Sequence, residues 1–115
     1  MDEVVVEKVL RAIEEVPPGR VVSYGDLGAL VGINPRHLGL VLRHWGDNVT
    51  WWRVTNRDGE LPPELLARAR PRWQQEGIPE KPDGRGCRID THRVDLELLR
   101  RAYSRATDDL DDAAG

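Results

Sequence analysis

The stretch that decides the fold covers residues 23–45 and reads SYGDLGALVGINPRHLGLVLRHW. Its second half predicts a helix over residues 35–45, because Asn34 is a good N-cap residue and Pro35 suits the first helical position. One face of this helix is apolar at the i, i+3, i+4, i+7 spacing of an amphipathic helix, through Leu38, Val41, Leu42 and Trp45.

The first half of the stretch predicts a shorter helix over residues 24–31. Ser23 and Asp26 have the spacing of a capping box, with Asp in place of the usual Glu or Gln, and Gly32 ends the helix. Two short helices joined by a tight glycine-containing turn have the proportions of a helix-turn-helix.

The residues after this helix pair predict a wing. Residues 51–55 (Trp-Trp-Arg-Val-Thr) have the composition of a strand, and residues 56–59 (Asn-Arg-Asp-Gly) that of a turn. A strand and turn behind a helix-turn-helix indicate a winged arrangement. The predicted fold class is therefore mainly α with a small β component, a winged helix-turn-helix DNA-binding domain.

Three further helices are predicted around this unit, over residues 3–15, 63–76 and 94–105, with a loop over residues 78–92. The first has Asp2 as N-cap and an apolar stripe of Val5, Val6, Leu10, Ile13 and Val16. The second is expected to break or restart at Pro71. The last presents Leu96, Leu99 and Tyr103 on one face. We expect one domain over residues 1–105 and a disordered acidic tail over residues 106–115.

Composition narrows the class of protein. The chain has 115 residues, one Cys and a net charge of −3, so it can bury a modest core but cannot form an internal disulfide or a zinc site built from several cysteines. It contains no apolar run of membrane-spanning length and no secretory signal, and the expected compartment is the cytoplasm. The negative net charge argues against a protein that binds nucleic acid. However, residues 20–57 carry +3, and the acidic residues are concentrated at the two ends.

The exposed face of helix 35–45 is the first candidate for function. Arg36, Gly39, Leu40 and Arg43 share this face at 100° per residue. A glycine in mid-helix costs about 1 kcal/mol against Ala, and it suits a position that another backbone must approach closely. The face fits contact with a DNA backbone. A solvated charged face with an incidental glycine is the alternative.

Groups able to do chemistry are few. Trp51 and Trp52 would point to opposite faces of a strand, so that one fills the core and the other lines a surface or pocket; a purely structural role for both is the alternative. Tyr24 is a second candidate for stacking or hydrogen bonding. Cys87 lies between Gly86 and Arg88 with no histidine related to it, and is expected to be an incidental exposed thiol. The histidines lack the i, i+4 spacing of a helical metal pair, and no metal or cofactor is expected.

Several segments, in this order, resemble the O6-alkylguanine-DNA alkyltransferases. Residues 17–27 (PPGRVVSYGDL) resemble the entry to their DNA-binding domain, and residues 36–43 (RHLGLVLR) their recognition helix. Residues 50–54 (TWWRV) lie where those enzymes carry Pro-Cys-His-Arg-Val. Residues 75–77 (QEG) resemble the end of that domain, and residues 93–96 (RVDL) the tail of the alkyltransferase-like proteins.

The residue at the position of the reactive cysteine is Trp51, which is the mark of the alkyltransferase-like proteins, the non-enzymatic relatives that bind alkylated DNA. Alkyl transfer needs a thiolate activated by a base, and Trp51 supplies no nucleophile. The histidine that follows the cysteine is replaced by Trp52, so that Glu76, which orients this histidine in the enzymes, has no partner. The resemblance thus implies that the chain is not an enzyme and has no catalytic residues.

The resemblance also implies roles in DNA binding. Arg36 would enter the duplex from the minor groove and fill the space of a flipped base, and Tyr24 would push on the neighbouring phosphate. Gly39 would let the helix approach the DNA closely, and Arg43 would add positive potential. Flipping costs a few kcal/mol, and less for a weakened base pair.

The lesion pocket that the resemblance implies would hold the extruded O6-alkylguanine against Trp51. Tyr24 and Arg53 would contribute to it, and its other wall would be the turn formed by Asn56, Arg57, Asp58 and Gly59. Stacking of a base on an aromatic side chain is worth about 1–3 kcal/mol.

The implied partners are duplex DNA with O6-alkylguanine lesions and proteins of nucleotide excision repair, with the chain acting as a monomer, off the membrane, and associated with the nucleoid when it binds DNA. A winged-helix regulator that reads sequence with residues 35–45 in the major groove is the alternative. A second alternative is an enzyme that uses Cys87 as its reactive thiol.

Overall fold

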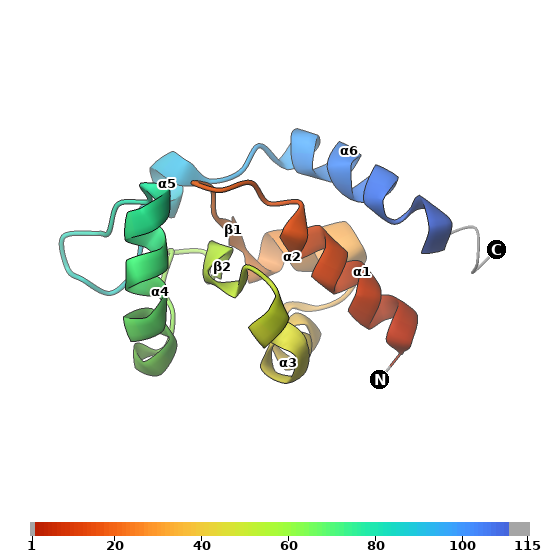
Figure 1. The fold of residues 1–115 in the computed structure, drawn as a ribbon, viewed down its shortest axis with the longest axis horizontal. Coiled ribbons are helices and arrows are strands. Elements are labelled where there is room, and N and C mark those ends of the chain that lie inside the picture. The colour runs from red at the N-terminus through yellow and green to blue at the C-terminus, as the bar shows by residue number, and fades with distance from the viewer. Residues whose placement is uncertain (1, 111–115) are drawn as a thin grey trace.

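The computed structural model describes residues 2–110, and within them six α-helices and two 3₁₀ helices surround a two-stranded sheet (Figure 1). In chain order the elements are α1 (Glu3–Glu14), β1 (Val22–Ser23), α2 (Tyr24–Val31), α3 (Pro35–Trp45), η1 (Gly46–Asn48), η2 (Trp51–Arg53), β2 (Val54–Thr55), α4 (Pro63–Glu76), α5 (Ile89–His92) and α6 (Leu96–Ala106). The fold is mainly α with a small β component, as predicted.

The helix-turn-helix forms through the predicted caps. Ser23 and Asp26 make a reciprocal capping box at the start of α2, and Gly32 ends that helix with φ +89°. Asn34 caps α3 by accepting the amide of His37 at 2.7 Å. A Cβ on Gly28 would lie 2.6 Å from the carbonyl oxygen of Ile33, so this glycine allows the turn to pack closely against α2.

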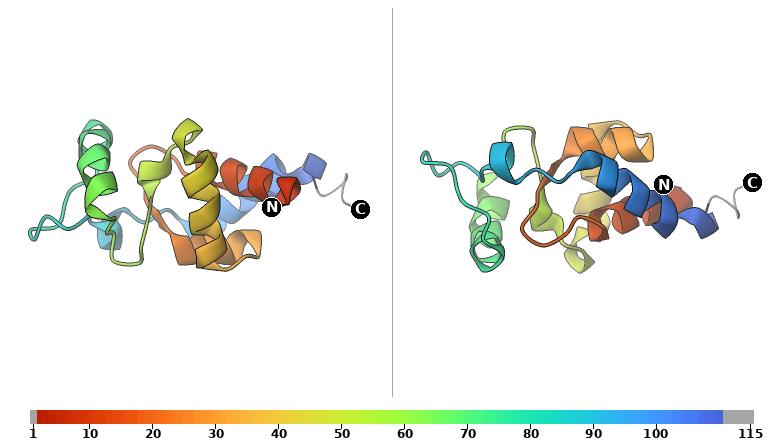
Figure 2. Two further views of the ribbon diagram at one scale, coloured as in Figure 1. Left: turned by 90° about the horizontal axis from the view of Figure 1, so that it is seen from below. Right: turned by 90° about the horizontal axis from the view of Figure 1, so that it is seen from above.

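The main core lies between α1, α2 and α3, and α6 packs along α1 (Figures 1 and 2). Val6, Ile13 and Val16 are buried as predicted, whereas Val5 and Leu10 are only partly buried. Their places in the core are taken by Val9 and Ala12, because at 100° per residue these two lie nearer the centre of the buried face. In α3 the predicted apolar face is correct for Leu38 and Val41, while Leu42 is partly buried and Trp45 is exposed.

The predicted strand over residues 51–55 is wrong in its first three residues. Residues 51–53 form the 3₁₀ helix η2, closed by the Arg53 amide donating to the Thr50 carbonyl at 3.1 Å. The parallel ladder of β1 and β2 pairs only Val22 with Val54 and Ser23 with Thr55. A strand through Trp51 and Trp52 would have no partner there, so the backbone satisfies its hydrogen bonds locally. The two indoles therefore do not alternate across a sheet.

A second apolar cluster joins α4 to the long connection behind it. Trp73 and Ala69 of α4 pack with Ile78, Cys87 and Ile89. The expected break at Pro71 does not occur, because α4 is anchored by the buried Ala69 and Trp73 on either side of the proline. Residues 78–92 are a loop except for α5 and the isolated bridges Glu60–Gly86 and Glu80–Cys87.

The C-terminal helix is capped by Asp95, whose carboxylate accepts the amides of Glu97 and Leu98. Leu99 is buried, but Leu96 is 41% exposed and does not contribute to the face predicted for it. Beyond α6, Thr107 is buried and Asp109 pairs with Arg11 of α1. The prediction of disorder is therefore wrong for residues 106–110, which pack on the domain. Residues 111–115, the rest of the predicted tail, lie outside the described residues. Within residues 2–110, no helix is both long enough and apolar enough to cross a bilayer.

Candidate nucleic-acid interface

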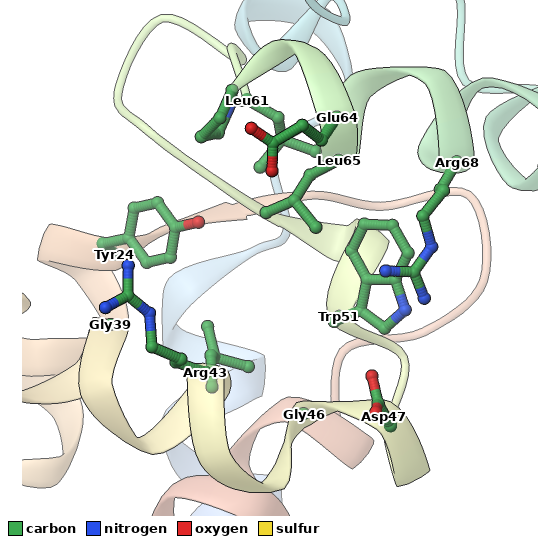
Figure 3. A pocket seen from close by; sticks show the side chains of 12 residues that line it. Tyr24, Gly39, Arg43, Gly46, Asp47, Trp51, Leu61, Glu64, Leu65 and Arg68 are labelled. Atoms are coloured by element: carbon green, nitrogen blue, oxygen red, sulfur yellow. The ribbon is translucent and has the colours of Figure 1, made fainter.

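A pocket of about 460 Å³ opens where α2, α3, η2 and α4 meet (Figure 3). Its lining residues come from five segments: Tyr24; Gly39, Leu42 and Arg43; Gly46 and Asp47; Trp51; and Leu61, Pro62, Glu64, Leu65 and Arg68. Four residues singled out from the sequence, at positions 24, 39, 43 and 51, are thus brought together around one cavity.

Tyr24 and Trp51 lie on opposite sides of this pocket. The capping box places Tyr24 on the first turn of α2, and its hydroxyl points into the cavity (Figure 3). Burial of the ring raises the pKa of Tyr24 above its usual value, so the group remains a neutral phenol that can donate a hydrogen bond at neutral pH. The two aromatic rings leave between them a space with an apolar wall and a polar donor.

The indole of Trp51 is covered on one side by a cation. The guanidinium carbon of Arg68 lies 5.1 Å from its ring centroid, and the Trp52 ring meets it edge-on at 6.0 Å and 84°. Arg72, one turn along α4, stacks in the same way over Trp52 at 4.7 Å. Arg68 and Arg72 are exposed, and their stacking on indoles leaves guanidinium N–H edges available to other acceptors.

The residues of α3 that were predicted to face DNA lie partly inside the pocket and partly outside it. Gly39 and Arg43 line the pocket, whereas Arg36 lies exposed on the first turn of α3, outside it. Among the residues that the structure describes, none has an atom within 4 Å of a Cβ added to Gly39, so packing does not require a glycine there. Leu40 is 43% exposed next to it. Gly39 lowers the stability of the helix and does not help the packing. Close approach of the backbone of a ligand to α3 would explain a glycine at this position.

Arg53 does not belong to the pocket, contrary to expectation. Its side chain is 10% exposed, and it donates through Nε and Nη2 to Glu76 and through Nη1 to the Val16 carbonyl at 2.8 Å. The 3₁₀ turn of η2 directs this side chain inward, away from Trp51. The expectation that Glu76 has no partner is also wrong, because Glu76 accepts from Arg53, from the indole N–H of Trp52 at 2.8 Å and from the amide of Gly19.

Glu76 is a carboxylate stabilised by its donors. Partial burial alone would raise its pKa, but the hydrogen bonds from Arg53, Trp52 and Gly19 outweigh burial and hold the pKa below its usual value. The group is therefore charged at neutral pH.

The turn over Asn56, Arg57, Asp58 and Gly59 does not line the pocket either. The Asn56 side chain closes this turn by accepting the amides of Asp58 and Glu60, and the Gly59 carbonyl accepts the amide of Cys87 at 2.8 Å. This turn packs on residues 86–87. Arg57 and Asp58 therefore line a separate depression, together with Lys81 and Arg88.

The wall expected from that turn is formed instead by the next segment, through Leu61, Leu65 and Arg68, which sequence reasoning missed. The signal that could have found them is the i, i+3 spacing of Leu65 and Arg68 at the start of a predicted helix, which places an apolar and a cationic side chain side by side. The charged residues that line the cavity are Arg43, Arg68, Asp47 and Glu64, so both signs of charge are present.

Cys87 is not the exposed thiol that was expected. It is fully buried in the second apolar cluster, and burial raises its pKa to about 11. A protonated buried thiol is a poor nucleophile. Among the residues that the structure describes, no group of three or more His, Cys, Asp or Glu side chains could hold a metal ion.

A helix-turn-helix whose two flanking strands pair in a small parallel sheet, with a cavity beside its second helix, defines a winged-helix type of DNA-binding domain. Residues 5–78 match the sequence profile described as 6-O-methylguanine DNA methyltransferase, DNA binding domain, and the chain belongs to this family.

The fold also matches that of Atl1 from S. pombe, solved as a crystal structure in complex with damaged DNA containing O6-carboxymethylguanine. The two chains superpose with a TM-score of 0.70 and share 24% sequence identity over 82% of this chain and 97% of Atl1. A comparison with curated proteins found no match. The family match supports the resemblance to the O6-alkylguanine-DNA alkyltransferases, and the match to Atl1 shows that the two chains share a fold.

Proposed function

We propose that the chain binds duplex DNA containing O6-alkylguanine and leaves the alkyl group in place. The observation that carries this proposal is the pocket beside α3 in which Trp51 faces Tyr24. The pocket is bounded by an aromatic wall suited to stacking a purine, and position 51 holds an indole where the transferases carry their thiol. An indole cannot accept an alkyl group in the way that a thiolate does.

Binding proceeds by extrusion of the damaged base from the minor-groove side. Arg36, exposed on the first turn of α3, enters the duplex, while Gly39 lets the helix approach the backbone. Tyr24 pushes on the phosphate next to the lesion, and the base stacks on Trp51. Extrusion costs a few kcal/mol and is cheaper for a base whose pairing is already weakened, which favours the damaged over the normal guanine.

The direct test is a pair of fluorescence-anisotropy titrations with identical duplexes that carry guanine or O6-methylguanine at one position. We expect tighter binding to the damaged duplex, and equal affinity would contradict the proposal. Arg36→Ala and Tyr24→Phe should each weaken binding to the damaged duplex. Arg100→Ala is the control, because Arg100 is an exposed arginine on α6, which crosses the molecule on the side away from α3 (Figure 2).

Two further measurements separate this function from its alternatives. Mass spectrometry of the intact protein after incubation with alkylated DNA should show no added alkyl group, and an adduct would overturn the non-enzymatic assignment. Selection from random undamaged duplexes should enrich no sequence, since recognition is of the lesion. Enrichment of a single site would favour a sequence-reading regulator.

We also propose that the bound complex is passed to nucleotide excision repair, which the resemblance to the alkyltransferase-like proteins implies. Incision of a lesion-bearing plasmid by a reconstituted excision nuclease should increase when the chain is added. The same plasmid without the lesion is the control, and incision that the chain leaves unchanged would contradict this step.

A further inference from the structure

Trp52 is held at two points by hydrogen bonds. Its indole N–H donates to Glu76 Oε2 at 2.8 Å, and its backbone carbonyl accepts the indole N–H of the buried Trp73 at 2.7 Å. Glu76 lies at the end of α4 and is itself fixed by Arg53 and by the amide of Gly19. The ring of Trp52 therefore has little freedom to rotate.

The ring of Trp51 rests on this fixed neighbour. Trp52 meets it edge-on with ring centroids 6.0 Å apart, while Arg68 covers it from α4. Edge-to-face contact is a favoured geometry for two aromatic rings and has a defined orientation. The plane of the pocket wall thus depends on where Trp52 is held, although Trp52 itself does not line the pocket.

We propose that Trp52 and Glu76 are positioning residues for lesion recognition, which fix the Trp51 indole in the plane that receives an extruded purine. This inference rests on the proposed function. In the transferases that the chain resembles, the residue at position 52 is a histidine oriented by the same glutamate. Here the carboxylate holds an indole, so the hydrogen bond serves to hold an aromatic wall.

The contribution of this network should appear in discrimination between damaged and normal DNA. Binding to undamaged duplex uses the exposed residues of α3 and needs no pocket, whereas binding to the lesion needs the wall in place. Loss of the Trp52–Glu76 hydrogen bond should therefore lower the ratio of the two affinities and leave the affinity for undamaged duplex unchanged. A variant that merely loses stability changes the folded fraction and scales both affinities together.

The experiment compares two substitutions at one position. Trp52→Phe keeps a six-membered ring against Trp51 but removes the donor, and we expect the affinity ratio to fall by about tenfold, the size of one hydrogen bond to a charged group. Trp52→His restores an N–H donor to Glu76 and should recover the ratio to within about threefold of wild type. The dependence of binding on salt should be the same for all three proteins, because phosphate contacts are unchanged.

Glu76→Gln gives an independent measurement from the other partner, and it should also lower the ratio. Leu99→Ala is the control for stability, because Leu99 is the buried residue of α6 and does not line the pocket. It should leave the ratio unchanged.

The failures of the two proposals are distinguishable. Wild-type protein that binds both duplexes equally would overturn the proposed function. Wild-type protein that discriminates, together with a Trp52→Phe variant that discriminates equally well, would overturn the positioning role alone.

Discussion

Arg53 and Glu76, 23 residues apart in sequence, form a forked ion pair that joins η2 to the end of α4. Arg53 donates to the carboxylate through Nε at 2.9 Å and through Nη2 at 2.7 Å, and its third nitrogen reaches the Val16 carbonyl. Both side chains are almost completely buried, at 10% and 12% exposure. This pair ties together the three distant segments that carry Val16, Arg53 and Glu76.

Removing one member of this pair should be strongly destabilising. Arg53→Ala leaves the Glu76 carboxylate buried without its main donor, and we expect the free energy of unfolding to fall by about 3–5 kcal/mol in denaturant titrations. Arg88→Ala, which breaks an exposed pair with Asp90, is the matched control and should cost less than about 1 kcal/mol. Equal effects of the two substitutions would contradict the account of Arg53.

Gly39→Ala should separate stability from binding. A Cβ at this position would meet no atom of the described residues within 4 Å, and Ala is favoured over Gly in a helix by about 0.5–1 kcal/mol, so the midpoint of thermal unfolding should rise. The same methyl group would stand between α3 and a DNA backbone, and the affinity for lesion-containing duplex should fall by about tenfold. A more stable protein with unchanged affinity would favour the view that this is a solvated face.

Gly59→Ala should destabilise the protein for two reasons. The residue has φ +80°, and an added Cβ would lie 2.2 Å from the Cys87 carbonyl oxygen. Gly77→Ala is the comparison, since Gly77 has φ +73° but open space around its Cβ, so the expected cost there is only about 1–2 kcal/mol. Denaturant titrations should show a larger loss at position 59, and equal losses would contradict the contact with Cys87.

Cys87 should resist thiol reagents in the folded protein. With a pKa raised by burial to about 11, its thiolate fraction at pH 7.5 is about two orders of magnitude below that of an ordinary cysteine. Maleimide labelling should therefore be slow in native buffer and fast in denaturant. Stability should also fall as the pH rises above about 8.5, because the unfolded thiol ionises there while the folded thiol stays protonated. Fast labelling of native protein would contradict this environment.

The caps of the helix-turn-helix were predictable because they depend on neighbours in sequence. Ser23 with Asp26, and Asn34 with Pro35, satisfy backbone groups only a few residues away, and the structure confirms both. The continuity of α4 through Pro71 was not predictable, because it depends on packing with residues far along the chain.

The candidate site was predictable in part. Tyr24, Gly39, Arg43 and Trp51 were singled out from the sequence and do surround one pocket. Arg53 and the turn over residues 56–59 were expected at the lesion pocket too but do not line this cavity, since the direction of a side chain after a turn depends on what it can pair with. Arg53 turned inward to Glu76, and the turn packed on the segment of Cys87.

The sequence by itself determined the class of fold, the order of the five longer helices (α1, α2, α3, α4 and α6) and the absence of a thiol at position 51, because each of these follows from local spacing or residue identity. Only the tertiary structure decided which side chains share the pocket and what Glu76 does. That decision rests on contacts between residues tens of positions apart: Arg68 of α4 lies over Trp51, and Glu76 receives Trp52 and Arg53 together. Such contacts are selected by burial and charge pairing once the helices have packed, and local spacing does not encode them.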